Sequence, residues 1–223
     1  MTTRSSQKVV TGPFLIRNFI TYHQNTNEPV TGIIETFHEN GQLKTRGNYI
    51  DGKQDGVSVE FHENGQLSSR GNYKDGKEDG LWELFYEDGQ LELRGNHKDG
   101  KRDGLWEWFH YNGQLRSRGN YINGELDGLS EYFHENGQLR SRGNYRFGEL
   151  DGLSESYYEN GQLRSRGNYI GGNRDGLGGN RDGLSEWFHD NGQLERRGNY
   201  KDGKEDGLHE MFDEEGNLTD TWT

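Results

Sequence analysis

Repetition is the feature that most constrains the fold of this chain. The segment HENGQLRSRGNY at residues 134–145 recurs, in shorter or altered copies, from one end of the sequence to the other. The glycine of its Asn-Gly pair, or of the pair that replaces it, falls at residues 41, 65, 89, 113, 137, 161, 192 and 216. The step is therefore 24 residues, with one exception. A fixed period of this length is typical of a repeat protein, in which each unit packs mainly against its neighbours.

The exceptional step, from 161 to 192, has a visible origin. The segment GGNRDGL at 171–177 is followed at once by a second copy at 178–184. We expect this duplication to lengthen one loop and to leave the repeats on either side intact. The sequence does not indicate whether the longer loop has a role of its own.

Each repeat has the pattern of a β-hairpin. Asn136-Gly137 is the favoured pair for a two-residue type I′ turn, in which both residues have positive φ. The flanking segments have the length of strands and lack proline. A two-residue loop predicts that His134 faces Leu139 across the hairpin.

The predicted pairing also places opposite charges across from each other. Glu131 faces Arg142, and a pair of this kind contributes about 0.2–1 kcal/mol. Only the second repeat departs, with Val59 opposite Arg70. The other pairs of this Glu/Arg ladder are Glu35/Arg46, Glu83/Arg94, Glu107/Arg118, Glu155/Arg166 and Glu186/Arg197. A helix would explain none of these pairings.

A second turn, such as DGKEDG at 75–80, joins successive hairpins. The sequence therefore predicts an all-β fold, an elongated single-layer antiparallel meander of about eight 24-residue hairpins. Residues 1–32 hold both prolines of the chain and are expected to form an N-terminal cap with irregular strands. Residues 33–223 form the repeat array, and its truncated last repeat closes the other end.

Composition narrows the function. The formal net charge of −12 argues against binding to nucleic acid or to anionic lipid and favours a basic partner. The chain has no cysteine, which excludes disulfides and thiolate metal sites. No apolar stretch approaches the ~20 residues of a membrane span, and the first residues lack the pattern of a signal peptide. We therefore expect a cytoplasmic protein.

The segment GNYKDGKEDGLWELFYEDGQL at 71–91 resembles the MORN-type repeat, in the variant of bacterial and viral proteins known as YwqK-family antitoxins. The matching elements are the Gly-Leu-x-Glu segment, the aromatic residue before the turn, and an aromatic-x-x-Gly step that recurs at Tyr73–Gly76, Tyr121–Gly124 and Tyr200–Gly203. The resemblance covers about residues 33–218. It implies scaffolding of proteins, membrane association or neutralisation of a toxin, with no shared catalytic residues.

Five histidines occupy one position of the repeat and raise the question of a metal site: His38, His62, His110, His134 and His189. Equivalent residues of successive hairpins lie two strands apart, about 9.6 Å. Two imidazoles that share a zinc ion need nitrogens ~2 Å from it. We therefore expect structural histidines, stacked with leucines, and no metal.

The acidic loops leave a calcium site open. Two aspartates recur within the DGKxDG segments, as Asp75/Asp79, Asp99/Asp103 and Asp202/Asp206. Hard cations take six to eight oxygen ligands, and two carboxylates with nearby carbonyls could begin such a site. Asp-Gly is equally typical of a plain turn.

Nothing in the sequence predicts catalysis. It shows no serine, histidine and aspartate in the order of a catalytic triad, and GGNRDGLGGNRDG lacks the lysine and hydroxyl residue of a phosphate-binding loop. We therefore expect no enzymatic activity and no cofactor.

The positions that vary between repeats are more informative about binding. Apolar side chains concentrate in the third and fourth repeats and are predicted to share one face of the sheet. They are Trp82, Leu84, Leu93, Trp106 and Trp108, with Tyr132 beside them and Trp187 further along. Clustered tryptophans are typical anchors of a protein interface. The alternative is that they form the core of a sheet that has no second layer.

The favoured function is a non-enzymatic scaffold that binds another protein through this aromatic patch. One alternative is an antitoxin or inhibitor that masks a toxin or a defence protein. Others are a membrane-associated adaptor, against which the acidic charge argues, and a spacer with no specific partner. The sequence leaves open the partner, the oligomeric state and the face that binds.

Overall fold

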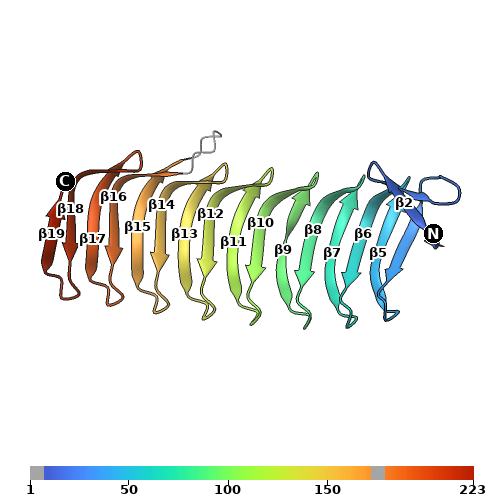
Figure 1. The fold of residues 1–223 in the computed structure, drawn as a ribbon, viewed down its shortest axis with the longest axis horizontal. Coiled ribbons are helices and arrows are strands. Elements are labelled where there is room, and N and C mark those ends of the chain that lie inside the picture. The colour runs from blue at the N-terminus through green and yellow to red at the C-terminus, as the bar shows by residue number, and fades with distance from the viewer. Residues whose placement is uncertain (1–7, 172–178) are drawn as a thin grey trace, which may run out of the picture. The chain divides into compact units, whose positions relative to one another are not determined.

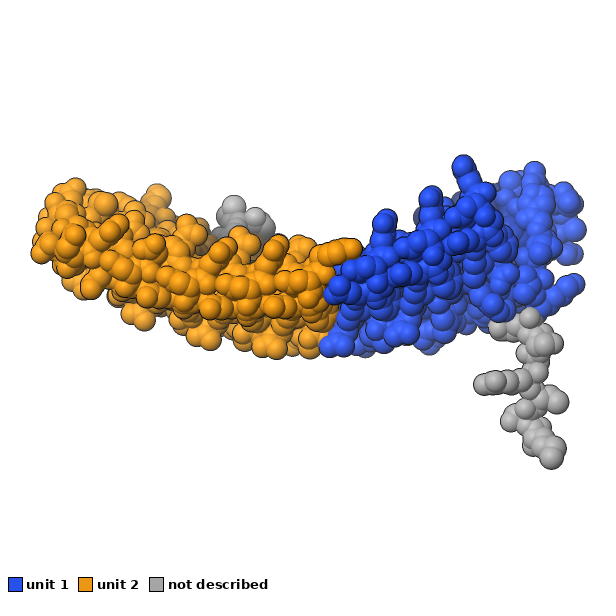
Figure 2. Space-filling view, turned by 90° about the horizontal axis from the view of Figure 1, so that it is seen from below, with its two compact units in different colours: residues 1–103 blue, residues 104–223 orange. Residues whose placement is uncertain are grey.

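The computed structural model describes residues 8–171 and 179–223, where every regular element is a β-strand (Figure 1). The chain divides into two compact units, residues 1–103 and 104–223 (Figure 2), and the boundary falls within β10 (Lys101–Phe109). In the described residues, no helix is present that could serve as a membrane span. The prediction of an all-β repeat protein is confirmed.

Unit 1 contains three hairpins, which pair in chain order as an antiparallel meander. Their strands are β4 (Gly32–Phe37), β5 (Leu43–Ile50), β6 (Lys53–Phe61), β7 (Leu67–Lys74), β8 (Lys77–Phe85) and β9 (Leu91–Lys98). Successive side chains of a β-strand point to opposite faces of the sheet, so every second side chain lies on the same face.

Three short strands precede the first hairpin. β1 (Val9–Val10) pairs in parallel with β4, and β2 (Phe14–Arg17) forms a separate hairpin with β3 (Ile20–His23). Backbone bonds tie this segment to the first interhairpin turn: Thr21 N donates to Gly52 O at 2.8 Å, and Gly52 N donates to Val30 O at 2.7 Å. The segment before β4 therefore packs on the first repeat.

Unit 2 continues the same pattern through five hairpins. Its further strands are β11 (Leu115–Ile122), β12 (Glu125–Phe133), β13 (Leu139–Arg146), β14 (Glu149–Tyr157), β15 (Leu163–Ile170), β16 (Asn180–Phe188), β17 (Leu194–Lys201), β18 (Lys204–Phe212) and β19 (Leu218–Trp222).

The duplicated segment at 171–184 connects β15 to β16, and its residues 172–178 lie outside the described part. Across the insertion, Gly167 of β15 is opposite Ser185 of β16. The equivalent residues of the preceding repeat, Gly143 of β13 and Ser154 of β14, stand in the same register. The repeats next to the insertion therefore keep the geometry of the others.

The predicted register holds through the middle of each hairpin. Glu131 is the partner of Arg142 and Tyr132 of Ser141, and the remaining pairs of the Glu/Arg ladder stand opposite each other in the same way. Near the turn the prediction is wrong. A β-bulge between Tyr132 and Phe133 shifts the register, so Phe133 and not His134 is opposite Leu139.

The type of the Asn-Gly turn was also predicted wrongly. Gly137 has φ of 82°, Gly137 N donates to His134 O at 2.9 Å, and His134 N donates to Gln138 O at 2.8 Å. Asn136 is absent from the described residues with positive φ. These features define a three-residue loop, in which a type I turn is followed by a glycine bulge.

Type I′ turns occur at the opposite edge, where one hairpin passes to the next. In Asp75-Gly76 both residues have positive φ, 51° and 80°, and Lys74 is opposite Lys77 across a two-residue loop. The same turn forms at Asp51-Gly52, Asp99-Gly100, Asn123-Gly124, Phe147-Gly148 and Asp202-Gly203.

The two faces of the sheet differ in burial. We call the face that carries Trp82, Trp106 and Trp187 the aromatic face, and the face that carries the Glu/Arg ladder the ladder face. The aromatic face holds most of the buried side chains, among them Trp106, which is 1% exposed, and His209, which is 0% exposed. Glycines beneath the large rings make this burial possible, since a Cβ on Gly71 would lie 1.8 Å from the Trp82 ring.

Candidate functional site

Three residues of the predicted aromatic patch lie in unit 1. Trp82, on β8, is half-buried and packs edge-on against Tyr73 and His97, with ring centroids 5.6 Å and 6.0 Å away. Leu84 follows on the same strand, and Leu93 stands directly opposite it on β9. Trp82, Leu84 and Leu93 therefore form a continuous apolar surface on the aromatic face of unit 1.

Three further residues of the predicted patch lie in unit 2. The rings of Trp106 and Trp108 are 5.9 Å apart, and Tyr121, which the sequence did not single out, packs against both at 6.5 Å and 6.1 Å. Tyr132 is 42% exposed. Trp108, Tyr121 and Tyr132 border a hollow of ≈180 Å³.

The members of this cluster have different roles. Because Trp106 is 1% exposed, its ring belongs to the interior of the sheet and offers almost no surface to a partner. Tyr132 and the half-buried Trp108 are accessible. The sequence could not distinguish the buried tryptophan from the accessible aromatic residues, because the burial of a side chain depends on the size of the side chains on the neighbouring strands.

The ladder face carries an apolar row that the sequence analysis did not identify. The residue after the second glycine of each interhairpin segment is exposed on this face: Val57, Leu81, Leu105, Leu129, Leu153, Leu184 and Leu208. In unit 1, Ile33, Val57 and Val59 line a hollow of ≈480 Å³, and in unit 2, Leu153 and Leu184 border one of ≈280 Å³. The signal was present in the sequence as the recurring Gly-Leu pair.

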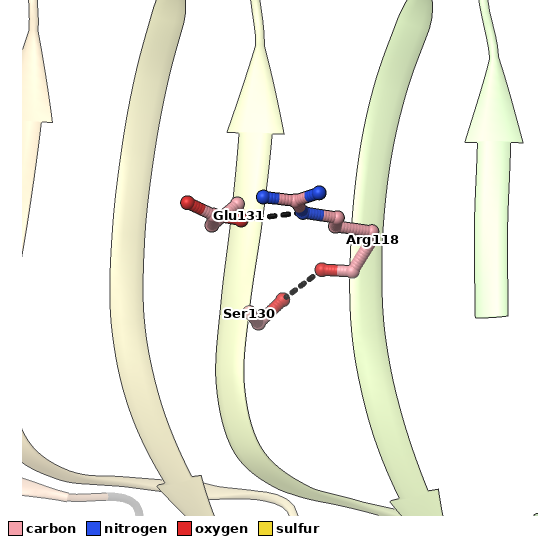
Figure 3. Close-up of polar contacts among 3 residues, drawn as sticks. All are labelled: Arg118, Ser130 and Glu131. Carbon is pink, nitrogen blue, oxygen red and sulfur yellow. Dashed lines mark hydrogen bonds and ion pairs between the residues drawn. The ribbon is translucent and has the colours of Figure 1, made fainter. Parts of the chain in front are cut away.

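The charged side chains of the ladder connect successive hairpins. Arg118 Nε donates to Glu131 Oε2 at 2.5 Å, across the boundary between two hairpins, and Ser130 Oγ donates to the carbonyl of Arg118 at 3.3 Å (Figure 3). The same contact joins Arg70 to Glu83, Arg142 to Glu155, Arg166 to Glu186 and Arg197 to Glu210.

These contacts correct the predicted partners within the ladder. Arg94 stands opposite Glu83 in the register of β8 and β9, as predicted, but Glu83 binds Arg70 of the preceding hairpin, and Arg94 is exposed. The reason is that Glu83 has an arginine opposite it on both neighbouring strands, Arg70 on β7 and Arg94 on β9. The pairing within one hairpin could not identify which of the two arginines the carboxylate binds.

The first hairpin keeps the predicted contact. Arg46 Nη1 lies 3.3 Å from Glu35 Oε1 of the same hairpin. On its other side, Arg46 is opposite Val59, which offers no carboxylate. The departure of the second repeat from the ladder pattern therefore explains why this arginine binds within its own hairpin.

These bonds hold the ladder in its charged form. The hydrogen bond from Arg197 lowers the pKa of Glu210, and the bond to Glu155 raises the pKa of Arg142. Several guanidinium groups also lie near an aromatic ring of the following strand, as Arg118 does at 6.0 Å from the Phe133 centroid. The ladder therefore joins neighbouring repeats.

The repeated histidines have a structural role, but not the one predicted. His38 Nε2 is 2.8 Å from the carbonyl oxygen of Phe61 in the next hairpin, and His134 Nε2 is 3.2 Å from that of Tyr157. Three further contacts of this kind are His62 to Phe85, His110 to Phe133 and His189 to Phe212. No group of three or more histidine and acidic residues in the described ranges is placed to hold a metal ion.

The acidic loops also make contacts between hairpins. Asp75 occupies the first position of a type I′ turn, and its backbone N donates to Asp55 Oδ2 of the preceding loop at 3.2 Å. Gly76 N donates to Gln54 O at 2.8 Å in the same place. The geometry thus gives Asp55, the second aspartate of its loop, a role in binding the next turn.

Trp187, the last residue of the predicted patch, lies elsewhere in unit 2, on β16. Its neighbours are Arg181 and Arg196, whose guanidinium carbons are 4.9 Å and 3.9 Å from its ring centroid. Tyr200, from β17, packs at 6.2 Å. The sequence analysis did not identify these arginines as part of a site.

Comparison with known proteins agrees with this architecture. The MORN repeat variant matches seven segments: 30–51, 54–75, 78–99, 102–123, 126–146, 150–170 and 181–202. The chain belongs to this family, whose repeats form a scaffold, and the predicted MORN-type resemblance is confirmed. No curated protein matches the chain.

Among the solved structures that match is a point mutant of TarM from S. aureus in complex with fondaparinux, alpha-GlcNAc-glycerol and UDP. The two chains are 15% identical, and the match covers 50% of this chain and 19% of that one, with a TM-score of 0.28. The matched region is thus about a fifth of the length of the TarM chain, and the similarity carries no functional conclusion.

Proposed function

We propose that this MORN-type scaffold binds another protein through its aromatic face and catalyses no reaction. The observation that carries the proposal is Tyr132, a large aromatic side chain that remains 42% exposed beside the half-buried Trp108. Exposed tyrosine and tryptophan on a rigid support are the typical anchors of protein interfaces. Trp187 is a further anchor in unit 2, and Trp82, Leu84 and Leu93 offer a separate apolar surface in unit 1.

The single layer of the sheet supports this proposal. The chain has an accessible surface of 14206 Å² and a mass of 25.7 kDa, for which a compact protein exposes about 10,400 Å². A specific protein interface buries about 1,200–2,000 Å² in total. The surplus area is therefore ample for a partner.

The charge of the chain indicates the nature of the partner. Four of the six described interhairpin turns begin with an exposed aspartate, at positions 51, 75, 99 and 202. Within an overall charge of −12, these loops favour encounter with a basic protein. The same observation favours the second candidate function, an inhibitor that masks a basic toxin or defence protein in the cytoplasm.

The test is capture of the partner from native lysate, followed by affinity measurement with the purified partner. A Trp108→Ala/Tyr132→Ala double variant is expected to bind at least tenfold more weakly, because two anchor side chains are removed. Leu129→Ala is the matched control, since it removes an exposed apolar side chain from the ladder face of the same unit.

Each other outcome has a definite meaning. If only Leu129→Ala loses the partner, the ladder face binds and the aromatic face does not. If neither variant changes the affinity, the aromatic anchors are wrong. Rescue of cell growth when the chain is produced with the captured partner would identify the inhibitor, and flotation with liposomes would instead support a membrane adaptor.

A further inference from the structure

Two arginines of unit 2 converge on one ring. Arg181 and Arg196 are both half-buried, and both guanidinium groups lie within 5 Å of the centroid of Trp187. Neither makes an ion pair with a carboxylate within residues 8–171 and 179–223. They differ in this from Arg118 and Arg142, each of which binds a glutamate.

Aromatic side chains hold Arg181 in place. Its Nε donates to the hydroxyl of Tyr169 at 3.0 Å, and its guanidinium carbon is 5.8 Å from the Tyr169 centroid and 5.5 Å from the Tyr200 centroid. Arginine has five N–H donors, and this contact uses one of them. The other N–H donors of Arg181 remain for a ligand, and the contacts with Tyr169 and Tyr200 fix the position of the guanidinium group before a ligand binds.

Arg181 and Trp187 border a hollow of ≈80 Å³ on the aromatic face. Its other lining groups are mainly hydroxyls, from Tyr169 and from Ser141, Ser154, Ser156 and Ser165. The hydroxyls of Ser156 and Ser165 are 2.7 Å apart. Serine hydroxyls donate and accept hydrogen bonds, so they can complete the shell of a small polar ligand.

Two charged residues of the ladder also contribute to the lining. Glu155 Oε2 accepts a hydrogen bond from Arg142 at 2.5 Å and another from the Tyr157 hydroxyl at 3.1 Å, while Arg166 pairs with Glu186. Their charges are thus compensated within the ladder. The uncompensated charge among the lining residues is that of Arg181, while Arg196 lies against the same Trp187 ring outside the lining.

A buried hydroxyl without a partner lies next to this hollow. Ser185 is 1% exposed, and its Oγ has no hydrogen-bond partner among the described residues. The side chain lies over Gly167, where an added Cβ would be 2.6 Å from Oγ, and Gly167 itself lines the hollow. An unsatisfied buried hydroxyl is unfavourable, and this one lies behind Gly167 without itself lining the hollow.

We propose that this hollow binds a small oxyanion, of the size of phosphate, sulfate or a carboxylate group. The two arginines beside the Trp187 ring repel each other, and an anion held by Arg181 in the hollow would offset this repulsion. The volume is about that of two or three water molecules at ~30 Å³ each, which suits such a group. Guanidinium groups and hydroxyls are the donors that bind oxyanions best.

The site belongs to one repeat and is not a property of the fold. At the position of Arg181 the other described repeats have Gln54, Glu78, Arg102, Leu126, Leu150 and Glu205. One other repeat has both an arginine and a tryptophan at these positions, Arg102 and Trp108, but it has Ser117 at the position of Arg196. The combination of Arg181, Trp187 and Arg196 therefore occurs once.

The experiment is a titration of the full ¹⁵N-labelled chain, followed through the indole N–H signal of Trp187. Phosphate, sulfate and acetate are compared at constant ionic strength against sodium chloride. We expect a saturable shift with at least one oxyanion, and the most effective of the three distinguishes a tetrahedral from a planar ligand. Arg181→Gln is expected to raise Kd at least tenfold, because it removes the charged donor that lines the hollow, and Arg196→Gln is expected to raise Kd less, because it removes only a neighbouring charge.

The controls make the result decisive. Arg118→Gln removes the same charge from unit 2 at a paired guanidinium whose partner, Glu131, does not line the hollow, and it is expected to leave Kd within about twofold. Arg181→Lys keeps the charge and the fold and is expected to bind with intermediate affinity. The proposal is overturned if sodium chloride produces the same shift, if no oxyanion saturates the signal, or if Arg118→Gln weakens binding as much as Arg181→Gln.

Discussion

At the scale of single residues, the glycines of the aromatic face determine where large rings fit. Gly71 lies beneath Trp82, and Gly198 lies beneath His209, where a Cβ would be 1.9 Å from Nδ1. A side chain at such a position cannot coexist with the ring in its present place. Glycine on one strand and a large residue on the next are therefore coupled.

The first prediction concerns this coupling. Gly71→Ala is expected to lower the free energy of unfolding by about 1–3 kcal/mol, because the Trp82 ring must move. Gly47→Ala is the control at the equivalent position, since its nearest neighbour is the flexible Gln54 side chain at 3.2 Å. Urea denaturation measures both, and equal losses would contradict the explanation.

The second prediction concerns His97, which replaces the tyrosine of other repeats. Burial lowers the pKa of His97, and Arg102 lowers it further, although Glu78 lies 3.1 Å from Nε2 and raises it. Because the folded chain resists protonation here, the stabilising contribution is complete above about pH 6.5 and is lost as the pH falls through the lowered value.

His97→Tyr removes this titration and restores the residue found at Tyr73 and Tyr121. We therefore expect the melting temperature of the original chain, relative to that of the variant, to fall between pH 7.5 and pH 5.5. Thermal melts in matched buffers measure the difference. A difference that does not vary with pH would contradict the assigned cause.

At the scale of elements, the two kinds of turn have separate tasks. The type I′ turns reverse the chain between hairpins, and five of the six described examples begin with aspartate or asparagine. The sixth begins with Phe147, which has φ of 53° and is 40% exposed. A bulky residue in this left-handed region is strained.

The third prediction follows from that strain. Phe147→Asn is expected to stabilise the chain by about 1 kcal/mol, because asparagine tolerates the left-handed region. The reverse change, Asn123→Phe in the neighbouring turn of the same kind, is expected to destabilise it by a similar amount. Chemical denaturation of both variants measures the pair, and changes of the same sign would exclude strain as the cause.

The Asn-Gly loops at the other edge connect hairpins through a side chain. Asn136 Oδ1 accepts from Gln138 N at 2.9 Å within its own loop, and Asn136 Nδ2 donates to Glu159 O of the next loop at 3.0 Å. Asn40, Asn64, Asn112, Asn160 and Asn191 make the same contact. The recurrence of asparagine thus has a cause other than the turn itself.

The fourth prediction separates these two bonds. Asn136→Asp keeps the acceptor within the loop and loses the donor to the next hairpin, so we expect a loss of about 0.5–1.5 kcal/mol. Asp88, at the equivalent position of another repeat, shows that an aspartate keeps the bond within the loop, because its Oδ1 accepts from Gln90 N at 2.9 Å. Urea denaturation of Asn136→Asp and Asn136→Ala distinguishes the bonds, and only the alanine variant is expected to lose both.

The comparison of sequence and structure is clearest in these elements. Glu131 and Arg142 could be placed opposite each other from the sequence, because a two-residue period and a known turn position fix the middle of a hairpin. The bulge at Phe133 could not be predicted, because a turn glycine is compatible both with a two-residue type I′ turn and with a three-residue loop that ends in a glycine bulge. The burial of Trp106 could not be predicted from one strand, because it depends on side chains of the neighbouring strands.

At the scale of the whole molecule, stability is shared among neighbours. Within unit 2, each strand from β11 to β18 pairs with the strand before it and the strand after it, and the last pair is β18 with β19. The terminal hairpin is closed by Trp222, whose ring stacks on the buried His209 at 5.2 Å. The effect of a substitution at this end is therefore expected to stay within the neighbouring repeats.

The fifth prediction uses that locality. Trp222→Ala is expected to speed amide hydrogen exchange in β17, β18 and β19, because His209 becomes accessible. Exchange in β4–β9 of unit 1 is expected to stay unchanged. Mass spectrometry of deuterated peptides measures both regions, and a uniform increase along the chain would show that the array unfolds as one cooperative block.

The bonds that cross from one hairpin to the next have a consequence for evolution. Most hairpins offer the same asparagine, histidine and arginine donors on one side and the same carbonyls and carboxylates on the other. A copied unit of 24 residues therefore fits between two existing units without adaptation of either. The gene can lengthen or shorten by unequal recombination in whole steps, while single copies diverge to acquire a site such as the one around Trp187.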